Sequence, residues 1–309
     1  MSIYLAVDAG GTKTLCFVAD ETQVLGRAIT GTVKIMSVGE EISTARLREV
    51  IYAALSDAGV RAASVTRTCI GLAGISSGSV RHWAYDALRT IVSGELLLCG
   101  DEEIALEAGC RGGPGVLVIA GTGSNIVGRC ANGTIVTVGG WGPMIGDEGS
   151  GSWIGQQAIR QALHSRDRDI DTSLLPEIQK YWGLKNIGEL VAKANQNPRP
   201  DYAELTPVVL KCALEGDALA EGVLRRAGEE LAEQVALCVS KMQDAGSVPG
   251  EVRRVDFTGS VLGRIPQVSQ AMKEQLSESL PGISVSDSAV DPLEGALWIA
   301  RRGKVAARV

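Results

Sequence analysis

Short apolar runs separated by glycine or polar turns open the chain and predict a set of β-strands. The runs are IYLAVDA (3–9), TLCFVAD (14–20) and VLGRAIT (24–30). Each has the length of an ordinary strand, and the turns between them are short. We therefore expect three consecutive strands that form an antiparallel meander.

Apolar spacing then changes to intervals of three and four residues, which predicts a helix over 40–59. Gly59 stands where a C-terminal cap is expected. The next predicted elements are a strand, a helix, and a second strand that turns into a helix, over 67–74, 79–92 and 94–109. In the last segment ELLLC is followed closely by Asp101, so a carboxylate marks the junction of strand and helix.

The strand pattern recurs after residue 115. VLVIAGTGSNIVGRC (116–130) contains two strands and a turn, and TIVTVGG (134–140) adds a third strand. In both places a buried strand runs into a Gly/Thr turn, DAGGTKT (8–14) or AGTGSN (120–125), and then into another strand. This repetition predicts two similar halves, each carrying one turn at the same point of its sheet.

Helices dominate the second half of the chain. Asp217 is a candidate N-cap for a long helix over 217–243, whose apolar or small residues keep helical spacing. A strand (255–261) and a helix (292–301) follow, and NQNPRPD (195–201) is a linker-like loop between helices.

Composition and charge limit the classes of partner. The chain has 309 residues, 45% apolar and 21% charged, so we expect a folded protein of two domains. A net charge of −6 without a basic run disfavours nucleic acid and anionic membranes as partners. No run of about eighteen apolar residues is present, and MSIYLAVDAGGTKT reaches its glycines too soon for a signal peptide. We therefore expect a cytoplasmic protein.

Cysteine and histidine usage narrows the chemistry. The seven cysteines are an odd number without C-x-x-C spacing, which argues against a disulfide framework, a structural zinc site or a cluster. We expect reduced, mostly buried thiols. His82 and His164 both lie outside the glycine-rich segments, so we assign acid–base chemistry to carboxylates.

The turn DAGGTKT predicts a phosphate-binding nest, because glycines let backbone N–H groups point into one concavity. A threonine adds a hydroxyl donor and a lysine adds positive charge. Asp8 is a candidate to hold Mg²⁺ through a bound water. On its own such a turn is more often an ordinary hairpin. The candidate phosphate-binding residues here are Gly10, Gly11, Thr12 and Lys13.

A matching turn in the second half strengthens this interpretation. Gly121, Thr122 and Gly123 form it, and two such turns are expected to grip one nucleotide from both sides. The patterns G-x-x-x-x-G-K-[ST] and G-x-G-x-x-G are absent, so neither a P-loop nor a Rossmann site is expected.

A third turn, DFTGSVLGR (256–264), lies between a strand and a helix. It is either a simple connection or part of the nucleotide site. In the second case Gly259 and Ser260 would let an adenine lie flat against the backbone, and Gly263 would permit the same close approach.

Asp101 is the candidate catalytic base. An aspartate at the start of a helix is usually an N-cap, and that interpretation remains open here. In phosphoryl transfer a carboxylate accepts the proton of the attacking hydroxyl, and an Asp with a pKa near ~4 is ionised at pH 7. Glu102 and Glu103 are weaker candidates, because acids in the first turn favour the helix dipole.

Together these features resemble the sugar kinases of the actin-like ATPase superfamily. The resemblance is closest to the N-acetylglucosamine kinase group, with its BadF/BadG/BcrA/BcrD-type ATPase domain. Six motifs carry it, in the family's order over nearly the whole chain: DAGGTKT, GDEE, AGTGSN, GGWGPMIGDEGSGSWIG, FTGSVLG and DPLEGALWIA. It implies an α/β fold of two ribonuclease-H-like lobes around a cleft that holds ATP and a hexosamine. The lobes would be 1–115, with a helix at about 291–305 packing back on it, and 116–290.

The resemblance also implies residue roles and partners. Thr12 and Thr122 would contact the ATP phosphates, Asp101 would take the proton of the sugar 6-hydroxyl, and Gly259 and Gly263 would lie on the nucleotide side. ATP with Mg²⁺ and an amino sugar are the implied ligands, and a homodimer is common in the family. The residues that would hold the sugar are Gly140, Trp141, Gly142 and Asp147.

The stretch GGWGPMIGDEGSGSWIG (139–155) would then form one wall of the sugar pocket. Its first glycines would bring the backbone and the Trp141 ring close to the sugar, and Asp147 would offer a carboxylate to sugar hydroxyls. Trp153 is expected to pack in the core on the helix that follows.

One departure from the family concerns the sugar. Such kinases carry an Asn-containing turn after the third strand, whereas this chain reads ITGTVKIMSVG (29–39). One hypothesis is that Lys34 or Ser37 takes over part of that contact, and a cation there would favour a sugar with an acidic substituent, such as N-acetylmuramic acid. The simpler alternative is a solvated loop lysine. Glucosamine is a further candidate substrate.

Other classes remain open from the sequence. An ATPase that activates an acyl-CoA dehydratase or reductase would need cysteines at a subunit interface, whereas Cys212 and Cys238 are isolated on expected helices. An actin- or chaperone-like switch would have no use for the tryptophan and acids of 139–155. Repressor/glucokinase-type kinases share the fold class but carry a Cys/His zinc motif that is missing here, so this class is set aside.

Overall fold

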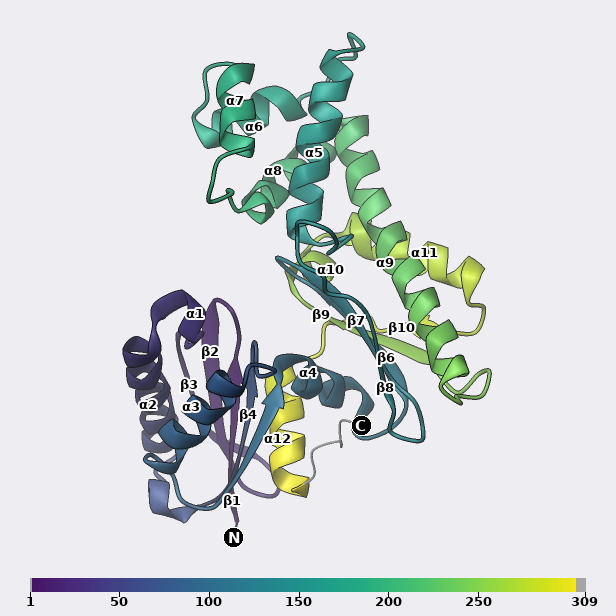
Figure 1. Ribbon diagram of the computed structural model, residues 1–309. Helices are drawn as coiled ribbons and strands as arrows, with labels where there is room; N and C mark the ends of the chain where they lie inside the picture. Colours follow the sequence, from purple (N-terminus) through teal and green to yellow (C-terminus); the bar gives the residue numbers. More distant parts are fainter. Residues whose placement is uncertain (1, 304–309) are drawn as a thin grey trace. The chain divides into compact units, whose positions relative to one another are not determined.

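The structure is a computed structural model that describes residues 2–303. The chain divides into two compact units (Figure 1). Unit 1 takes its described residues from Met1–Gly113 and Val290–Val309, and unit 2 is Pro114–Ala289. Each unit is built on its own five-stranded sheet.

The sheet of unit 1 has the order β3-β2-β1-β4-β5. Its strands are β1 (Ile3–Ala9), β2 (Lys13–Ala19), β3 (Val24–Gly31), β4 (Val65–Leu72) and β5 (Glu95–Gly100). β1, β2 and β3 form the antiparallel meander that the sequence predicts, whereas β1, β4 and β5 run parallel. β1 is the central strand and is covered on both faces, which explains why its sequence is almost continuously apolar.

Helices cover both faces of this sheet. They are α1 (Ile35–Val38), α2 (Glu40–Asp57), α3 (Gly78–Arg89), α4 (Asp101–Cys110) and α12 (Pro292–Arg302), with the 3₁₀ turn η1 (Ala62–Ser64). Leu5 and Val7 of β1 pack in one core with α2 and α3, and Tyr4 and Ala6 face the other core with α4 and α12. Alternating side chains of one strand thus join two separate apolar layers.

Unit 2 repeats the same strand order, β10-β9-β6-β7-β8. Its strands are β6 (Gly115–Ala120), β7 (Ser124–Arg129), β8 (Ile135–Gly139), β9 (Arg254–Thr258) and β10 (Ser284–Val285). β6, β7 and β8 pair antiparallel, and β6, β9 and β10 run parallel. Since both the order and the directions match those of unit 1, the predicted internal repeat is confirmed.

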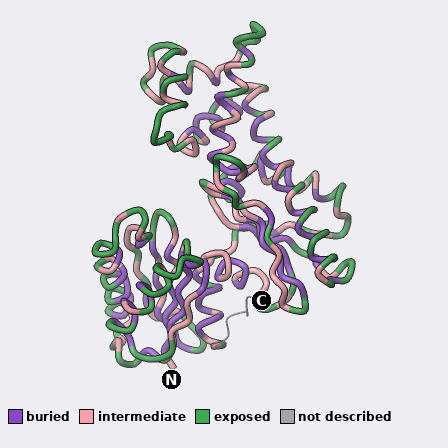
Figure 2. Tube along the Cα trace, in the orientation of Figure 1, coloured by how far each residue is buried: buried purple, intermediate pink, exposed green. Residues whose placement is uncertain are grey.

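The remaining helices belong to unit 2. They are α5 (Gly151–Arg166), α6 (Leu174–Trp182), α7 (Ile187–Ala194), α8 (Thr206–Leu214), α9 (Ala218–Asp244), α10 (Ser260–Arg264) and α11 (Pro266–Ser279), with the 3₁₀ turn η2 (Tyr202–Leu205). α9 packs on β6, β7 and β8, and α11 lies alongside α9 (Figure 1). Within each unit the buried residues gather along the sheet and the helix faces that meet it (Figure 2).

Two helix ends predicted from their cap residues are confirmed by the structure. Gly59 follows α2 with φ of 63°, and Asp217 caps α9 by accepting the N–H groups of Leu219 and Ala220. The strand predicted over 255–261 is too long, because β9 ends at Thr258 and the chain enters α10 at Ser260. The two-residue strand β10 and the short helix α1 are not predicted by the local sequence pattern.

The cysteines are mostly buried thiols, as the sequence predicts. All seven cysteines are free thiols, and six are buried, with Cys110 partly exposed. Within residues 2–303, no helix combines the length and apolarity needed to span a bilayer.

Candidate active site

The strand register of unit 1 brings three strand ends into one row. Ala9 is paired with Leu72, and Leu72 with Gly100. Because β1, β4 and β5 are parallel, the residues that follow them leave the same edge of the sheet. Two inter-strand spacings separate β1 from β5, which is about 10 Å. The turn after β1 and Asp101 after β5 therefore share one edge.

The first turn follows β1, and Lys13 begins β2. The Thr32 hydroxyl donates to the carbonyl oxygen of Gly10 at 3.0 Å and so fastens the turn to the end of β3. Neither Gly10 nor Gly11 has a positive φ. A Cβ on Gly11 would meet no atom within 4 Å. The glycines here provide open space at the turn, but they do not adopt the glycine-favouring conformation that the sequence predicts.

Asp8 carries a carboxylate in an unfavourable electrostatic position. Burial, followed by repulsion from Asp101 and Asp291, raises the pKa of Asp8 from 3.8 to about 6, and Lys13 offsets part of that rise. Such repulsion is strong only at short range, so the three carboxylates share one negatively charged region of unit 1. Among the described residues, no three His, Cys, Asp or Glu side chains are grouped closely enough to hold a metal ion directly.

Asp101 is the first residue of α4 and is half-buried. Gly100 occupies the N-cap position, so the N-cap interpretation of Asp101 is wrong. The N–H of Glu102 donates to Oδ1 of Asp101 at 3.2 Å. The carboxylate therefore lies at a helix N-terminus, where the dipole favours its ionised form.

Asp291 is the first residue of the motif DPLEGALWIA, and the sequence predicts no role for its side chain. It caps α12, accepting the N–H of Leu293 at 3.0 Å, with Pro292 in the first turn of the helix. An Asp-Pro pair before an apolar run is a signal for a helix start. The Asp-Pro pair therefore predicts that Asp291 caps a helix. Only the folded structure brings its carboxylate close enough to raise the pKa of Asp8.

The second turn, Gly121–Gly123, occupies the equivalent point between β6 and β7 in unit 2. The carbonyl oxygen of Gly121 accepts the N–H of Gly151 at 2.8 Å, and that of Thr122 accepts the N–H of Ser152 at 3.1 Å. The turn is therefore held against the first turn of α5.

A cavity of about 380 Å³ adjoins this second turn within unit 2. Its volume is in the range of small-molecule sites. Gly259, between β9 and α10, has φ of 101°, and a Cβ there would overlap the carbonyl oxygen of Ala120. Gly263 lies in α10 but does not line the cavity. Residues that do line it include Gly121, Thr122, Thr206, Leu210, Ser260 and Arg264.

In the glycine-rich stretch after β8, two glycines adopt a backbone conformation with positive φ. Gly140 and Gly142 have φ of 72° and 86°, a region that L side chains rarely adopt. Trp141 between them is 73% exposed. Trp153, in contrast, packs against the core of unit 2 from α5, as the sequence predicts. Ser150 caps α5 by accepting the N–H of Trp153.

Asp147 in the same stretch is turned inward and is 5% exposed. Its Oδ1 accepts the N–H of Gly142 at 2.9 Å. Its Oδ2 faces Gly123, where a Cβ would lie 2.6 Å away. Burial raises the pKa of this carboxyl group. Asp147 therefore links the glycine-rich stretch to the second turn.

Lys34 is exposed in unit 1, directly before α1. Its backbone N–H donates to the Thr32 hydroxyl at 3.1 Å. The residues proposed for the sugar are thus distributed over both units. Asp101 and Lys34 belong to unit 1, and Gly140, Trp141, Gly142 and Asp147 to unit 2.

Solved structures define the class of this fold. A protein from Chromobacterium violaceum assigned as an N-acetylglucosamine kinase matches with a TM-score of 0.75 and 24% identity over 97% of this chain and 99% of its own. A ROK hexokinase from Thermus thermophilus matches with a TM-score of 0.61 and 16% identity over 97% and 98%. The two units have the α/β fold of two-lobed sugar kinases.

The chain belongs to the BadF/BadG/BcrA/BcrD ATPase family, which matches residues 5–300. It is 29% identical to the N-acetylmuramic acid/N-acetylglucosamine kinase of Clostridium acetobutylicum, over 97% of this chain and 99% of that protein. It is 27% identical to the N-acetyl-D-glucosamine kinase of Dictyostelium discoideum, over 98% of each. Use of ATP is therefore a property of its family.

Proposed function

We propose that this protein is an ATP-dependent kinase that phosphorylates the 6-hydroxyl of an amino sugar, with N-acetylglucosamine as the first candidate. One observation carries the proposal: the first glycine turn, Asp8 and Asp101 occupy one edge of the sheet in unit 1. The names of the curated relatives, which are amino-sugar kinases, support it.

Asp101 is proposed as the general base. The sugar oxygen forms a bond to the γ-phosphorus, the bond from that phosphorus to the ADP oxygen breaks, and the hydroxyl proton passes to the Asp101 carboxylate. Phosphoryl transfer depends mainly on positioning and charge stabilisation, so a base held by the start of a helix suffices. A helix N-terminus is also a favourable place for the negative charge of a carboxylate base.

The first turn and Asp8 are proposed for the phosphates and Mg²⁺. The backbone N–H groups of Gly10, Gly11 and Thr12 would donate to phosphate oxygens, and Lys13 would add positive charge. Asp8 fits a water-bridged Mg²⁺, because burial and then its acidic neighbours destabilise the ionised carboxylate, which a cation would stabilise. When bound, Mg²⁺ would neutralise charge on the phosphates.

Unit 2 is proposed to supply the nucleotide and sugar walls. Thr122 and Ser260 line the 380 Å³ cavity, which is proposed to hold the adenine, and Gly259 lets the turn before Ser260 pack against the Ala120 backbone. Gly123 belongs to the same turn, and Gly263 to the helix that begins at Ser260. In the glycine-rich stretch the exposed Trp141 ring would cover the sugar. Gly140 and Gly142 would give the loop its backbone conformation, and Asp147 would hold the loop in place through the N–H of Gly142.

A coupled assay of ADP release tests the proposal. The wild-type chain should release ADP when N-acetylglucosamine, glucosamine or N-acetylmuramic acid is added, and the phosphorylated carbon can be read by NMR of the product. Sugar-independent ADP release with no phosphosugar would contradict the kinase assignment and would favour an ATPase switch.

N-acetylmuramic acid is a second candidate substrate, on two observations. Lys34 provides an exposed cation where the family carries a neutral Asn-containing turn. The clostridial relative is named for both sugars. A lactyl carboxylate would pair with this ammonium group, whereas N-acetylglucosamine would not need it.

The dehydratase-activator alternative receives no support from the cysteines. An iron–sulfur cluster shared between two subunits needs exposed thiols, but Cys212 and Cys238 are fully buried in the core of unit 2.

The kinase is further proposed to act in the cytoplasm, where ATP is available, and as a homodimer without nucleic-acid partners.

A further inference from the structure

A cavity of about 310 Å³ lies in the helical part of unit 2. Three segments line it: one face of α5, the second half of α7 and the loop that leads from α7 into η2. Its volume is at the lower end of the range of small-molecule sites. The lining residues used below are Ile159, Arg160, Leu163, Leu190, Val191 and Arg199.

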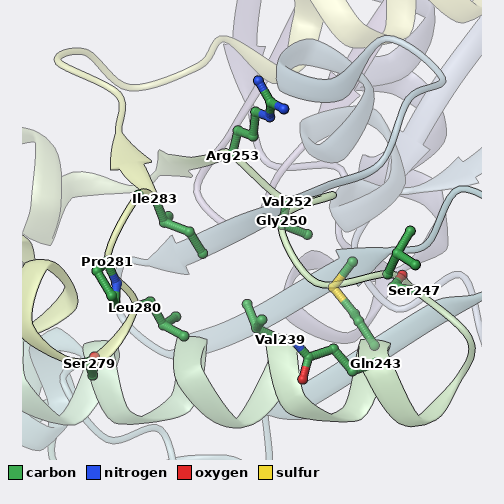
Figure 3. A pocket seen from close by; sticks show the side chains of 13 residues that line it. Val239, Gln243, Ser247, Gly250, Val252, Arg253, Ser279, Leu280, Pro281 and Ile283 are labelled. Carbon is green, nitrogen blue, oxygen red and sulfur yellow. The ribbon is translucent and has the colours of Figure 1, made fainter.

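This cavity differs in charge from the larger one, of about 420 Å³, at the end of α9. Apolar side chains make up most of the lining of that larger cavity, and Arg253 points away from the other side chains there (Figure 3). The Oγ of Ser247 in its wall is buried. In the cavity beside α5, in contrast, two exposed arginines belong to the lining.

Arg160 lies on the face of α5 that lines the cavity. Ile159 and Leu163 line it too, and residues three and four positions apart share one side of a helix. Ile159 is 6% exposed, whereas Arg160 is an exposed residue. A ligand from solvent can therefore reach the Arg160 guanidinium group.

Arg199 comes from the loop between α7 and η2, and this loop is fastened to α7. The Tyr202 hydroxyl donates to the carbonyl oxygen of Ala194. The side-chain amide of Asn195 donates to the carbonyl oxygen of Val191 at 2.9 Å. Since both ends of the loop are held in this way, Arg199 is presented on an anchored segment and is also exposed.

No acidic residue balances the two arginines. Among the described residues that line the cavity, none is Asp or Glu. Within residues 2–303, Arg160 and Arg199 form no ion pair. Two acids that are near in sequence are bound elsewhere: Asp201 accepts the N–H of Ala203 at 2.9 Å, and Glu189 accepts that of Lys185 at 2.7 Å. The cavity therefore offers two unneutralised cations in a chain with a net charge of −6.

The floor of the cavity is apolar. Ile159 and Leu190 are buried members of the core cluster of unit 2, and Leu163 packs against that cluster. Val191 is 45% exposed, so apolar surface extends from the floor to solvent. A compact apolar group placed here would exchange water for these side chains.

We propose that this cavity binds a small phosphomonoester that carries a compact apolar group. Arg160 and Arg199 donate N–H groups to the phosphate oxygens, because a guanidinium group presents paired donors that match a phosphate. The apolar group lies over Ile159, Leu190 and Val191. No described residue lines both this cavity and the proposed nucleotide cavity, so the site does not depend on the proposed kinase activity.

Isothermal titration calorimetry of the full chain tests the site, with phenyl phosphate as the probe and saturating ADP present to fill the proposed nucleotide site. We expect saturable binding with a dissociation constant of about 1 mM or lower. Inorganic phosphate should bind roughly fivefold more weakly, because it buries no ring. Phenol, which lacks the phosphate, should not bind at these concentrations. Added salt should weaken binding of phenyl phosphate.

Variants locate the binding. Arg160→Gln and Arg199→Gln should each weaken phenyl phosphate binding by roughly fivefold or more, because each removes a charged donor. Arg166→Gln makes the same charge change at an exposed residue of α5 outside the cavity and should leave the affinity unchanged. Thermal melts of all three variants should match that of the wild type, since each changes an exposed side chain.

Four results would overturn the proposal. The first is the absence of saturable heat with wild-type protein up to about ten times the expected dissociation constant. The second is phenol binding as tightly as phenyl phosphate, and the third is inorganic phosphate doing so. The fourth is an equal effect of Arg160→Gln, Arg199→Gln and Arg166→Gln, which would show a general charge effect in place of a site.

Discussion

Oδ2 of Asp147 occupies the space beside Gly123, 2.6 Å from where a Cβ would lie, while Oδ1 of the same carboxylate binds the N–H of Gly142. One buried side chain thus joins the second turn to the glycine-rich stretch. The two segments are nineteen residues apart between Gly123 and Gly142, but they are held as one surface of unit 2.

This relationship predicts the effect of Gly123→Ala. The added methyl group should displace the Asp147 carboxylate and lower the free energy of unfolding by about 1–3 kcal/mol, with a raised KM for ATP. Urea denaturation and initial-rate kinetics measure the two effects. A double variant with Asp147→Ala supplies the control, because the alanine should cost less once the carboxylate is gone. Strict additivity would show that the contact does not matter.

Asp101→Asn should remove the proposed base and leave the fold intact. We expect kcat to fall by about 10²–10⁴-fold, with ADP affinity and thermal stability close to those of the wild type. Steady-state kinetics and calorimetric ADP titration separate these quantities. Glu102→Gln is the matched control on the same helical turn and should retain most activity. An Asp101→Asn enzyme with wild-type turnover would refute the assignment.

Asp8 should set an acidic limit to activity. Its pKa is raised to about 6 in the folded protein, chiefly by burial. The phosphate and Mg²⁺ role needs the ionised carboxylate, so kcat/KM for ATP should fall as the pH drops below about 6. A profile that stays flat down to pH 5 would exclude Asp8 from that role.

The same raised pKa predicts an effect on stability with a definite sign. Because the folded state holds the Asp8 proton more tightly than the unfolded chain, the contribution of Asp8 to stability is lost as the pH rises from about 4 through 6. Asp8→Asn removes this loss. The variant should match the wild type near pH 4 and exceed its free energy of unfolding at pH 8 by up to about 3 kcal/mol. Urea denaturation at both pH values checks this, and a variant less stable at pH 8 would contradict it.

Gly259→Ala should damage the nucleotide side of unit 2. The methyl group would overlap the Ala120 carbonyl oxygen at a φ of 101°, so stability should fall by about 2–4 kcal/mol and ADP binding should weaken. Gly222→Ala is the control, because Gly222 lies in α9 with open space around it and should become slightly more stable. Equal effects at both positions would contradict this explanation.

Lys34→Ala separates the two candidate sugars. If the ammonium group pairs with a lactyl carboxylate, kcat/KM for N-acetylmuramic acid should fall by roughly tenfold, while that for N-acetylglucosamine stays within about twofold. Lys34→Arg should keep most of the preference. An unchanged ratio between the two sugars would identify Lys34 as a solvated loop lysine.

Much of the fold could be predicted from local pattern. The meander, the long helix after Asp217 and the repeated turns follow from apolar spacing and caps, which act over a few residues. The two-residue strand β10 could not be predicted, because its pairing with β9 depends on tertiary contacts.

The candidate site, too, could be predicted only in part from the local sequence. Sequence motifs selected Asp8 and Asp101, since each follows or ends a strand with a distinctive turn. The inward orientation of Asp147 and the electrostatic link from Asp291 to Asp8 depend on segments far apart in the chain. Neighbouring residues alone contain no information about such contacts.

The return of α12 to unit 1 has a consequence for synthesis on the ribosome. Unit 2 is continuous, whereas the core of unit 1 lacks Leu293, Leu297 and their neighbours until the last helix has been made. The second unit is therefore expected to fold before the first is complete. A stalled nascent chain that ends before Val290 should contain a protease-resistant unit 2 and an incompletely packed unit 1.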